Sequence, residues 1–395
     1  MHYRFGSSFA QLRDYASAAP HLRRALQLGE PIDKTGAGPV LGSAAELVGI
    51  DYILGQLQDT LPRYEAVLTA AEARIAADDT ALLDLRQQVA LGRYRLGDWS
   101  QAAQALQALL KSPGSSSPPS AFVGATELYL GQVLTDLARP ADAEVHLRRA
   151  VDVLTRTLGA MHARVAEAQS ALGRSLADAG QYVEAAAELD KAQDLAAHSA
   201  AAAPWIVAQP RYFRALLLLQ LDQPKKAEPI LTQLIESEDA TSAAYDQAQA
   251  APELDHTAAV RQALGEAYAR EGKFDDAVAT LQRAVAVRER AQGPQHPATV
   301  STRLSLAECL VAKGRDAEAR VILATPTIDL SALPAVHPIA AELDRVNGLL
   351  AQHEGNVEQA RKWFDSSLAI LQALHGPEDW RVLRARQELQ SAASS

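Results

Sequence analysis

The sequence predicts an all-α protein built from repeated helix pairs. Three observations support this prediction. The composition is rich in Ala, Leu, Gln, Glu and Arg, which lose little side-chain freedom in a helix. No alternating apolar and polar stretch of strand length stands out. A motif returns about every 42 residues along a chain of 395 residues, which is long enough for two or three ordinary domains or for one elongated array.

The repeated motif is clearest in EGKFDDAVATLQRAVAV, residues 271–287. Its anchor, Phe274, is preceded by a small residue nine positions earlier and by a Gly two positions earlier, and it is followed by Ala277, Leu281 and Ala284. Leu or Phe occupies the position of Leu281 in every readable copy, which chance does not easily produce. Eight copies fit the frame, and their anchors are Tyr15, Trp99, Pro140, Tyr182, Pro224, Phe274, Asp316 and Val357.

The spacing of the anchors predicts how the units follow one another. Successive anchors are 84, 41, 42, 42, 50, 42 and 41 residues apart. Because 84 is twice 42, a ninth, degenerate unit is expected in the first gap, with its anchor near Leu57 and with Tyr64 in the place of the Leu. The separation of 50 indicates one insertion, within residues 236–256. The spacing across KSPGSSSPPSA (residues 111–121) stays at 41, so this segment is predicted to be a loop between stacked units.

Each unit is predicted to form two helices joined by a tight turn. The small residue lets another helix approach its backbone closely, and the Gly before the anchor suits a left-handed conformation at the end of the first helix. The Ala and the Leu after the anchor lie four residues apart, on one face that packs onto the first helix. A single unit cannot bury both of its helices, so neighbouring units must stack.

This frame resembles the tetratricopeptide repeat (TPR) over nearly the whole chain. A period near 42, rather than 34, resembles the kinesin-light-chain type of TPR. That type often carries a Gly-x-x-His-Pro segment before the first helix, which the chain matches in part around His162, His296 and His337. The resemblance implies a right-handed α-solenoid of about nine TPR-like helix-turn-helix units, closed by a C-terminal capping helix.

The predicted organisation is a single TPR-like solenoid over residues 1–395. Gly6 already occupies the mid-helix position of the first unit, so we expect that the chain was cut from a longer protein or that its true start lies upstream of Met1. The parts are a truncated first unit (1–30), a degenerate unit (41–77), seven further units (81–111, 121–157, 163–197, 205–237, 257–290, 298–325 and 338–374) and a capping helix (377–392) expected to bury Trp380, Val382 and Leu383.

Composition argues against several classes of function. The net charge of −10 opposes a phosphate-binding surface, so no direct contact with nucleic acid is expected from this region. Cys309 is the sole cysteine, which rules out an intrachain disulfide and is interpreted as a buried small apolar residue. The longest apolar run, residues 215–221, is far shorter than the about 20 residues that span a bilayer, so we expect no membrane segment and a cytoplasmic location.

The sequence carries no motif for catalysis, a cofactor or a metal. It has no His-Glu-x-x-His, no Gly-x-Ser-x-Gly and no phosphate-binding loop, and GAGPVLG (residues 36–42) is interpreted as an ordinary loop. His162, His296 and His337 occur one per unit, and stacked units would hold them about 20 Å apart. A zinc ion needs its ligands about 2 Å away, so these histidines are interpreted as cap or loop contacts. We expect no enzyme, no cofactor and no metal site.

The TPR resemblance implies a concave groove, lined by the first helices, that holds a peptide or a helix of another protein. Residues at −3, +1, +4 and +5 from the small residue fall on one helical face, and their mixed polar and tyrosine side chains suit an extended segment. Ser170, Gln220 and Glu308 share these offsets. The candidate peptide-binding residues are Gln87, Tyr94, Arg95, Gln132, Asp136, Arg174, Asp178, Tyr212, Gln262, Glu266 and Arg270.

The leading functional hypothesis is a protein–protein interaction scaffold that binds a peptide or protein segment in this groove. The alternative is the C-terminal sensory or regulatory region of a larger bacterial signalling protein, behind a kinase or a winged-helix regulator. The excess of Arg over Lys and the abundance of Ala, typical of a GC-rich bacterial genome, favour that alternative. An enzyme is the third hypothesis. The sequence does not identify the partner or the oligomeric state.

Overall fold

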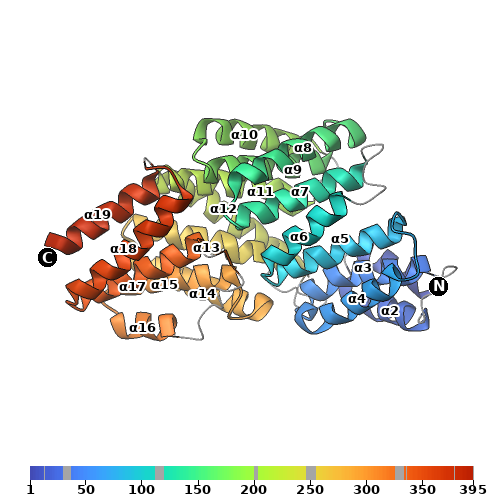
Figure 1. Cartoon of the computed structure of the whole chain (residues 1–395), viewed down its shortest axis with the longest axis horizontal. Coiled ribbons are helices and arrows are strands. Elements are labelled where there is room, and N and C mark those ends of the chain that lie inside the picture. Colours follow the sequence, from blue (N-terminus) through green and yellow to red (C-terminus); the bar gives the residue numbers. More distant parts are fainter. Residues whose placement is uncertain are drawn as a thin grey trace. The chain divides into compact units, whose positions relative to one another are not determined.

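The computed structural model describes residues 1–12, 14–29, 37–111, 120–199, 203–245, 255–324, 333–334, 336–377 and 379–394. Within these ranges the chain forms 19 α-helices and no β-strand, which confirms the predicted all-α class (Figure 1). The first helices of the pairs are α1 (His2–Gln11), α3 (Ala37–Ile53), α5 (Thr80–Arg95), α7 (Ala121–Asp136), α9 (Ala163–Asp178), α11 (Pro204–Gln220), α13 (Asp255–Arg270), α15 (Pro297–Ala312) and α17 (Pro338–His353).

The second helices begin where the repeat places them. They are α2 (Tyr15–Leu28), α4 (Leu57–Glu72), α6 (Trp99–Leu110), α8 (Pro140–Leu158), α10 (Tyr182–His198), α12 (Pro224–Tyr245), α14 (Phe274–Gln292), α16 (Asp316–Ala324) and α18 (Val357–Leu374), and α19 (Trp380–Ser394) follows. Each of the eight anchors is the first residue of its helix. The degenerate ninth unit is confirmed as well, because α4 begins at Leu57 and Tyr64 is fully buried.

The turn between the two helices of a pair contains a residue in the left-handed region, two positions before the anchor. Six of these residues are glycines with φ between 68° and 88°. In the two units whose anchor is a proline, Ala138 (φ 56°) and Asp222 (φ 55°) take the same conformation without the freedom of glycine. The chain geometry of the turn is therefore kept even where the residue that suits it is missing.

The close contact inside each pair follows the predicted frame. A Cβ added at Gly173 would lie 2.7 Å from Cγ of Leu189, and one added at Gly348 would lie 2.6 Å from Cε1 of Phe364. Leu189 and Phe364 are both about 1% exposed. Burying such a side chain stabilises the fold by roughly 1.5–3 kcal/mol, and only glycine leaves room for it here.

Three histidines cap first helices, as the cap interpretation predicts. His162, His296 and His337 are the N-caps of α9, α15 and α17. In each case Nδ1 accepts a hydrogen bond, of 3.1 to 3.2 Å, from the main-chain N–H two residues later. The imidazole therefore accepts the N-cap hydrogen bond that a Ser, Asp or Asn side chain usually accepts at the start of a helix.

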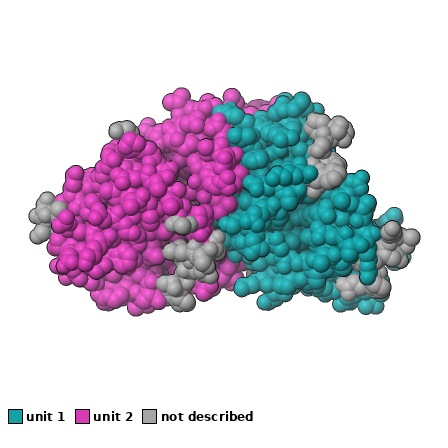
Figure 2. Space-filling model, viewed as in Figure 1, with its two compact units in different colours: residues 1–133, 145–160 teal, residues 134–144, 161–395 magenta. Residues whose placement is uncertain are grey.

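The chain divides into two compact units (Figure 2). Unit 1 comprises residues 1–133 and 145–160, and its core contains Leu22, Leu41, Tyr64 and Leu82. Unit 2 comprises residues 134–144 and 161–395, and its core consists of clusters formed by successive helix pairs, such as Ala215, Leu231 and Val260. The organisation as one solenoid with the unit boundaries given above stays a prediction.

The predicted loop at residues 36–42 is wrong for most of its length. Helix α3 begins at Ala37, so Gly38, Pro39 and Gly42 are helical. Pro39 lies in the first turn, where a proline removes no helical hydrogen bond and its fixed φ suits the helix. Residue 36, the first of that stretch, lies outside the described residues.

The capping helix is present, but only one of its three expected core residues is fully buried. Val382 is fully buried, Trp380 is partly buried, and Leu383 is 46% exposed. Consecutive residues of a helix point about 100° apart, so both cannot face the same neighbour. Val382 and Ala385, three positions apart, form the face that packs with Leu371 of α18.

The predicted insertion lengthens a helix where it is described. Helix α12 continues to Tyr245, well into the 236–256 stretch, and residues 246–254 lie outside the described residues. Most of the predicted loop at residues 111–121 also lies outside them. In the described part of the chain, no helix combines the length and the apolar character needed to cross a bilayer.

Candidate ligand-binding groove

The inner side of unit 2 contains a groove with a volume of about 1140 Å³. Its walls come from the first helices α11, α13, α15 and α17 and from α19, with one residue from the second helix α14 and two from α18. The apolar lining includes Leu304, Val311, Ile339, Leu349 and Leu371. First helices line it because they occupy the inner layer of the stacked pairs, which is where the repeat predicts a binding surface.

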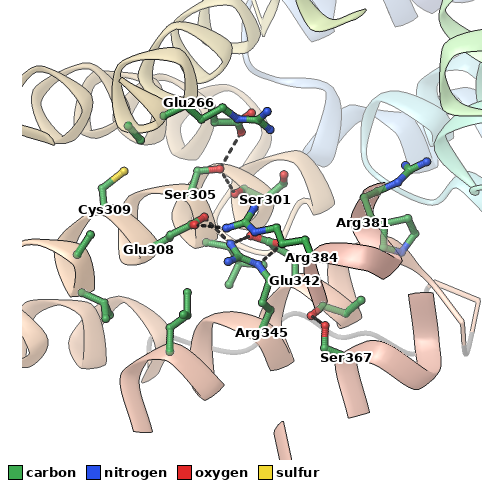
Figure 3. Close-up of a pocket in the computed structure, with 18 of the residues that line it drawn as sticks. Glu266, Ser301, Ser305, Glu308, Cys309, Glu342, Arg345, Ser367, Arg381 and Arg384 are labelled. Carbon is green, nitrogen blue, oxygen red and sulfur yellow. Dashed lines mark hydrogen bonds and ion pairs between the residues drawn. The ribbon is translucent and has the colours of Figure 1, made fainter. Parts of the chain in front are cut away.

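A group of ion pairs crosses the floor of the groove (Figure 3). Glu308 of α15 accepts a hydrogen bond of 2.8 Å from Arg384 of α19 and a second one from Arg345 of α17. Arg345 is only 4% exposed and also pairs with Glu342 (2.7 Å) and Glu388 (3.2 Å). This network ties three helices of the groove together.

The charges of this network are mutually stabilised. Burial by itself would raise the pKa of Glu308, but Arg345 and Arg384 outweigh it and hold that pKa well below its usual range. Burial acts against the charge of Arg345 too, and the surrounding carboxylates keep its pKa raised. Removing one partner would leave a buried charge unpaired, which typically costs about 3–5 kcal/mol.

A second polar network links α13 to α15 on the adjacent wall. Glu266 accepts hydrogen bonds of 2.9 Å from Gln262 and from Ser305. Gln262 in turn accepts a 3.0 Å hydrogen bond from Thr302 and donates one of 3.2 Å to Ser301. The polar side chains of this wall are thus held in fixed orientations before any ligand arrives.

At one end of the groove, α19 meets the C-terminal ends of earlier first helices. Arg381 donates a 3.2 Å hydrogen bond to the carbonyl oxygen of Asp178, and Gln220 donates one of 3.0 Å to the carboxylate of Asp178. The guanidinium of Arg270 lies 5.4 Å from the ring centre of Trp380. Burial raises the pKa of Asp178 in spite of these donors and of Arg174.

Two polar atoms of this end have no hydrogen-bond partner among the described residues. They are Nε1 of Trp380, a donor, and Oε1 of Gln220, an acceptor, and both are buried. Both residues line the groove. A buried polar atom without a partner costs about 1–3 kcal/mol, so a ligand that supplies one acceptor and one donor here would gain that energy.

The candidate residues of unit 2 are distributed around this groove. Glu266 and Arg270 line it, and Gln262 holds Glu266. Asp178 contacts α19 at its end, as described above. The other three lie outside the lining: Arg174 pairs with Asp136, and Tyr212 packs against the rings of Phe213 and His256.

The remaining candidates lie in unit 1 and are not part of this groove. Gln87 is buried and donates a 2.7 Å hydrogen bond to Thr126 of α7. Tyr94 and Arg95 end α5, and Gln132 is a partly exposed residue of α7. The role of all eleven candidates in peptide binding stays a prediction.

Sequence reasoning missed the groove residues of α17 and α19. Arg345 lies three positions before the small residue Gly348, so the same offset that selected Gln87 and Gln262 would have found it. Trp380, Arg381 and Arg384 follow the last repeat and have no position in the frame. The repeat frame therefore does not assign these three residues to the groove.

Cys309 also lines the groove, but its side chain is buried, as the sequence predicts. Burial raises the pKa of its thiol to about 12, so a reactive thiolate is not formed near neutral pH. Among the described residues, no three His, Cys, Asp or Glu side chains gather as a metal ion would require.

Family models identify the repeat. The tetratricopeptide repeat model matches residues 122–198 and 256–324, and a second tetratricopeptide repeat model matches residues 88–115. The protein is a tetratricopeptide repeat protein. Proteins with TPR folds generally serve as non-enzymatic interaction scaffolds, and no curated protein matches this TPR protein significantly.

Solved structures with the same fold cover the entire TPR protein. A Rap protein complexed with competence and sporulation factor covers 100% of this chain and 96% of its own, with a TM-score of 0.60 and 12% identity. The apo form of RapI covers 99% and 98%, with a TM-score of 0.52 and 10% identity. At such identities the likeness shows the fold alone.

A third structure, of TPR-like repeats from a putative kinesin light chain of Podosopora anserina, is 21% identical. It covers 52% of this chain and 93% of its own, with a TM-score of 0.38. A TM-score this low supports no structural argument. The 42-residue period therefore remains the ground on which the TPR protein is compared with the kinesin-light-chain type.

Proposed function

We propose that this TPR protein is an interaction scaffold whose groove in unit 2 binds an extended segment of a peptide or protein. The observation that carries this proposal is a groove of about 1140 Å³ built from the first helices of consecutive repeats. This volume exceeds the roughly 300–1,000 Å³ typical of small-molecule pockets, so it offers room for several residues of a peptide.

The chemistry of the lining suits a peptide backbone. Every residue of an extended peptide presents one N–H and one C=O, which match the unpaired acceptor of Gln220 and the unpaired donor of Trp380. Apolar side chains such as Leu304 and Leu349 offer contacts for side chains of the peptide. The charges of the floor are already paired with one another, so they favour neither a strongly acidic nor a strongly basic ligand.

The structural comparison supports the same proposal in general terms. A Rap protein with the same fold is complexed with competence and sporulation factor, so this architecture can hold a partner. The identity of only 12% carries no information on which segment this chain would bind. The partner is therefore defined by the groove: an extended segment with apolar side chains.

The test is a selection of peptides from a displayed library against the whole chain, followed by titration calorimetry of the selected peptides. Leu349→Arg fills the groove with a long charged side chain and is expected to weaken binding at least tenfold. Val183→Arg makes the same change on α10, where the side chain is 88% exposed and remote from the groove lining, and serves as the control. Selected peptides that bind both variants as tightly as the unaltered chain would rule out this groove as their site.

A further inference from the structure

An unusual arginine lies in unit 1. Arg95 is the last residue of α5, and its Nη1 is buried without a hydrogen-bond partner. Its guanidinium makes no hydrogen bond or ion pair with any residue of the described part of the chain, and it lies over the ring of Tyr52, 5.1 Å from the ring centre. Arginines in such a position are normally paired.

The surroundings of Arg95 contain aromatic hydroxyl groups in place of carboxylates. Burial lowers the pKa of Arg95, and the titratable groups that act on it are Tyr52, Tyr129 and Tyr94. Two other buried charges of this chain have charged partners: Asp51 of unit 1 pairs with Arg23 at 2.5 Å, and Arg345 of unit 2 has three carboxylate partners. Arg95 differs from both, because no carboxylate pairs with it among the described residues.

The dipole of helix α5 stabilises the positive charge of Arg95 at its C-terminal end, but only slightly. A cation at the C-terminal end of a helix is stabilised by about 0.3–1 kcal/mol through the helix dipole. Removing a charge from water without a partner costs several kcal/mol. Buried charged groups without a partner cluster at functional sites, where a ligand can supply the opposite charge.

The space next to Nη1 is kept open by a glycine. A Cβ added at Gly49 of α3 would lie 3.7 Å from Nη1 of Arg95, which is ordinary contact distance. Because residue 49 has no side chain, that position supplies no hydrogen-bond partner for the guanidinium. Arg95, Tyr94 and Tyr52 are partly exposed, so this face of unit 1 can be approached from solvent.

We propose that Arg95, with Tyr52, Tyr94 and Tyr129 around it, binds an oxyanion group of a ligand, either a phosphate or a carboxylate. The planar guanidinium presents parallel N–H donors that match two oxygens of such a group. The inference gives a ligand chemistry to Arg95, which the sequence places among peptide-binding residues. It does not depend on the groove of unit 2, so either proposal can fail without the other.

The test uses the full chain, with sodium phosphate and N-acetylglycine as probes and sodium chloride at matched ionic strength as the reference. Binding is followed by the melting temperature and by the Nε–H resonances of arginine side chains. We expect one or both probes to bind saturably and to shift the Nε–H signal of Arg95. Binding of phosphate alone assigns a phosphate-bearing ligand, and binding of N-acetylglycine alone assigns a carboxylate. If neither probe exceeds the effect of chloride, the proposal is overturned.

Three variants locate the site. Arg95→Gln removes the guanidinium and should weaken binding at least tenfold. Arg93→Gln removes the same charge two residues earlier, where Arg93 pairs with Glu65 at 2.8 Å, and should leave binding unchanged. Gly49→Asp places a carboxylate beside Nη1, so it should raise the melting temperature and compete with the probes. Equal binding by Arg95→Gln and Arg93→Gln would contradict the proposal, and if Arg95→Gln does not fold, unchanged binding by Gly49→Asp would do so.

Discussion

The guanidinium of Arg381 donates a 3.2 Å hydrogen bond to the carbonyl oxygen of Asp178, 203 positions earlier in the chain. A similar contact joins Nε2 of His337 to the carbonyl oxygen of Asp136, at 2.9 Å and across 201 positions. In both cases a residue at the start of a late helix contacts the last residue of an earlier first helix, Asp178 of α9 or Asp136 of α7. The carbonyls at a helix end have no partner within the helix, so these side chains satisfy groups that need one.

The tie between Arg381 and Asp178 should stabilise unit 2. Arg381→Ala is expected to lower the free energy of unfolding by about 1–3 kcal/mol, because the hydrogen bond to Asp178 and the 2.9 Å ion pair with Asp379 are both lost. It should also increase hydrogen exchange in the first turn of α19. Arg386→Ala is the control, since Arg386 is a partly exposed residue of the same helix whose side chain donates a hydrogen bond to the carbonyl of Pro377, at 3.3 Å. Equal stabilities of the two variants would show that the tie contributes nothing.

The seam between α9 and α10 should not tolerate a methyl group at Gly173. Gly173→Ala places its Cβ 2.7 Å from Leu189, so we expect a loss of about 1–3 kcal/mol of stability from overpacking. Gly38→Ala adds the same group to a helix where no atom lies within 4 Å, and it should stabilise the protein by up to about 1 kcal/mol through helix propensity. Chemical denaturation of both variants gives the comparison, and a stable Gly173→Ala would contradict the close-contact interpretation.

The features that depend on the repeat period could be predicted from the sequence. All nine second helices begin at an anchor, and even the degenerate unit around Leu57 was found, because neighbouring units impose the same spacing on it. Contacts such as Arg381–Asp178 were not predictable. They depend on the small rotation between successive units, summed over several repeats, and the period carries no information on that rotation.

The sequence also did not predict which of two neighbouring side chains faces the adjacent helix. Val382 and Leu383 are equally apolar, and choosing which one faces α18 requires the register of the capping helix, which no repeat fixes. The uncompensated charge of Arg95 was also beyond sequence reasoning, because the absence of a carboxylate partner is a property of the packed helices.

Glycine substitutions at Ala138 and Asp222, the two left-handed turn residues that are not glycine, should stabilise the protein. Ala138→Gly removes the strain of a left-handed Ala, worth about 1–2 kcal/mol, and adds about 0.5–1 kcal/mol of unfolded-state entropy, so the net gain should be up to about 1 kcal/mol. Asp222→Gly should gain less, because Asp adopts this conformation more readily than Ala. Ala177→Gly, inside α9, is the control and should lose about 1 kcal/mol. Unfolding curves that place Ala138→Gly below the unaltered chain would contradict the argument.

Glu167 of α9 should make stability depend on pH in the direction opposite to a paired carboxylate. Burial raises the pKa of Glu167 to about 7, and Arg164 opposes this effect only in part. A raised pKa in the folded state means that the folded protein holds the proton more tightly than the unfolded chain. The stability associated with this group is therefore complete below the unfolded pKa of about 4.3 and is lost as the pH rises through about 7.

Glu167→Gln removes this penalty while keeping the shape of the side chain. At pH 8 the variant should be more stable than the unaltered chain by up to about 3 kcal/mol, and at pH 4 the two should be nearly equal. His375 changes the pH profile in the opposite sense, because burial lowers its pKa to about 4, but its contribution cancels when the two proteins are compared at each pH. Glu184→Gln, an exposed carboxylate on α10, controls for the change in net charge. A stability difference between Glu167→Gln and the unaltered chain that stays constant from pH 4 to pH 8 would show that Glu167 does not titrate near neutrality.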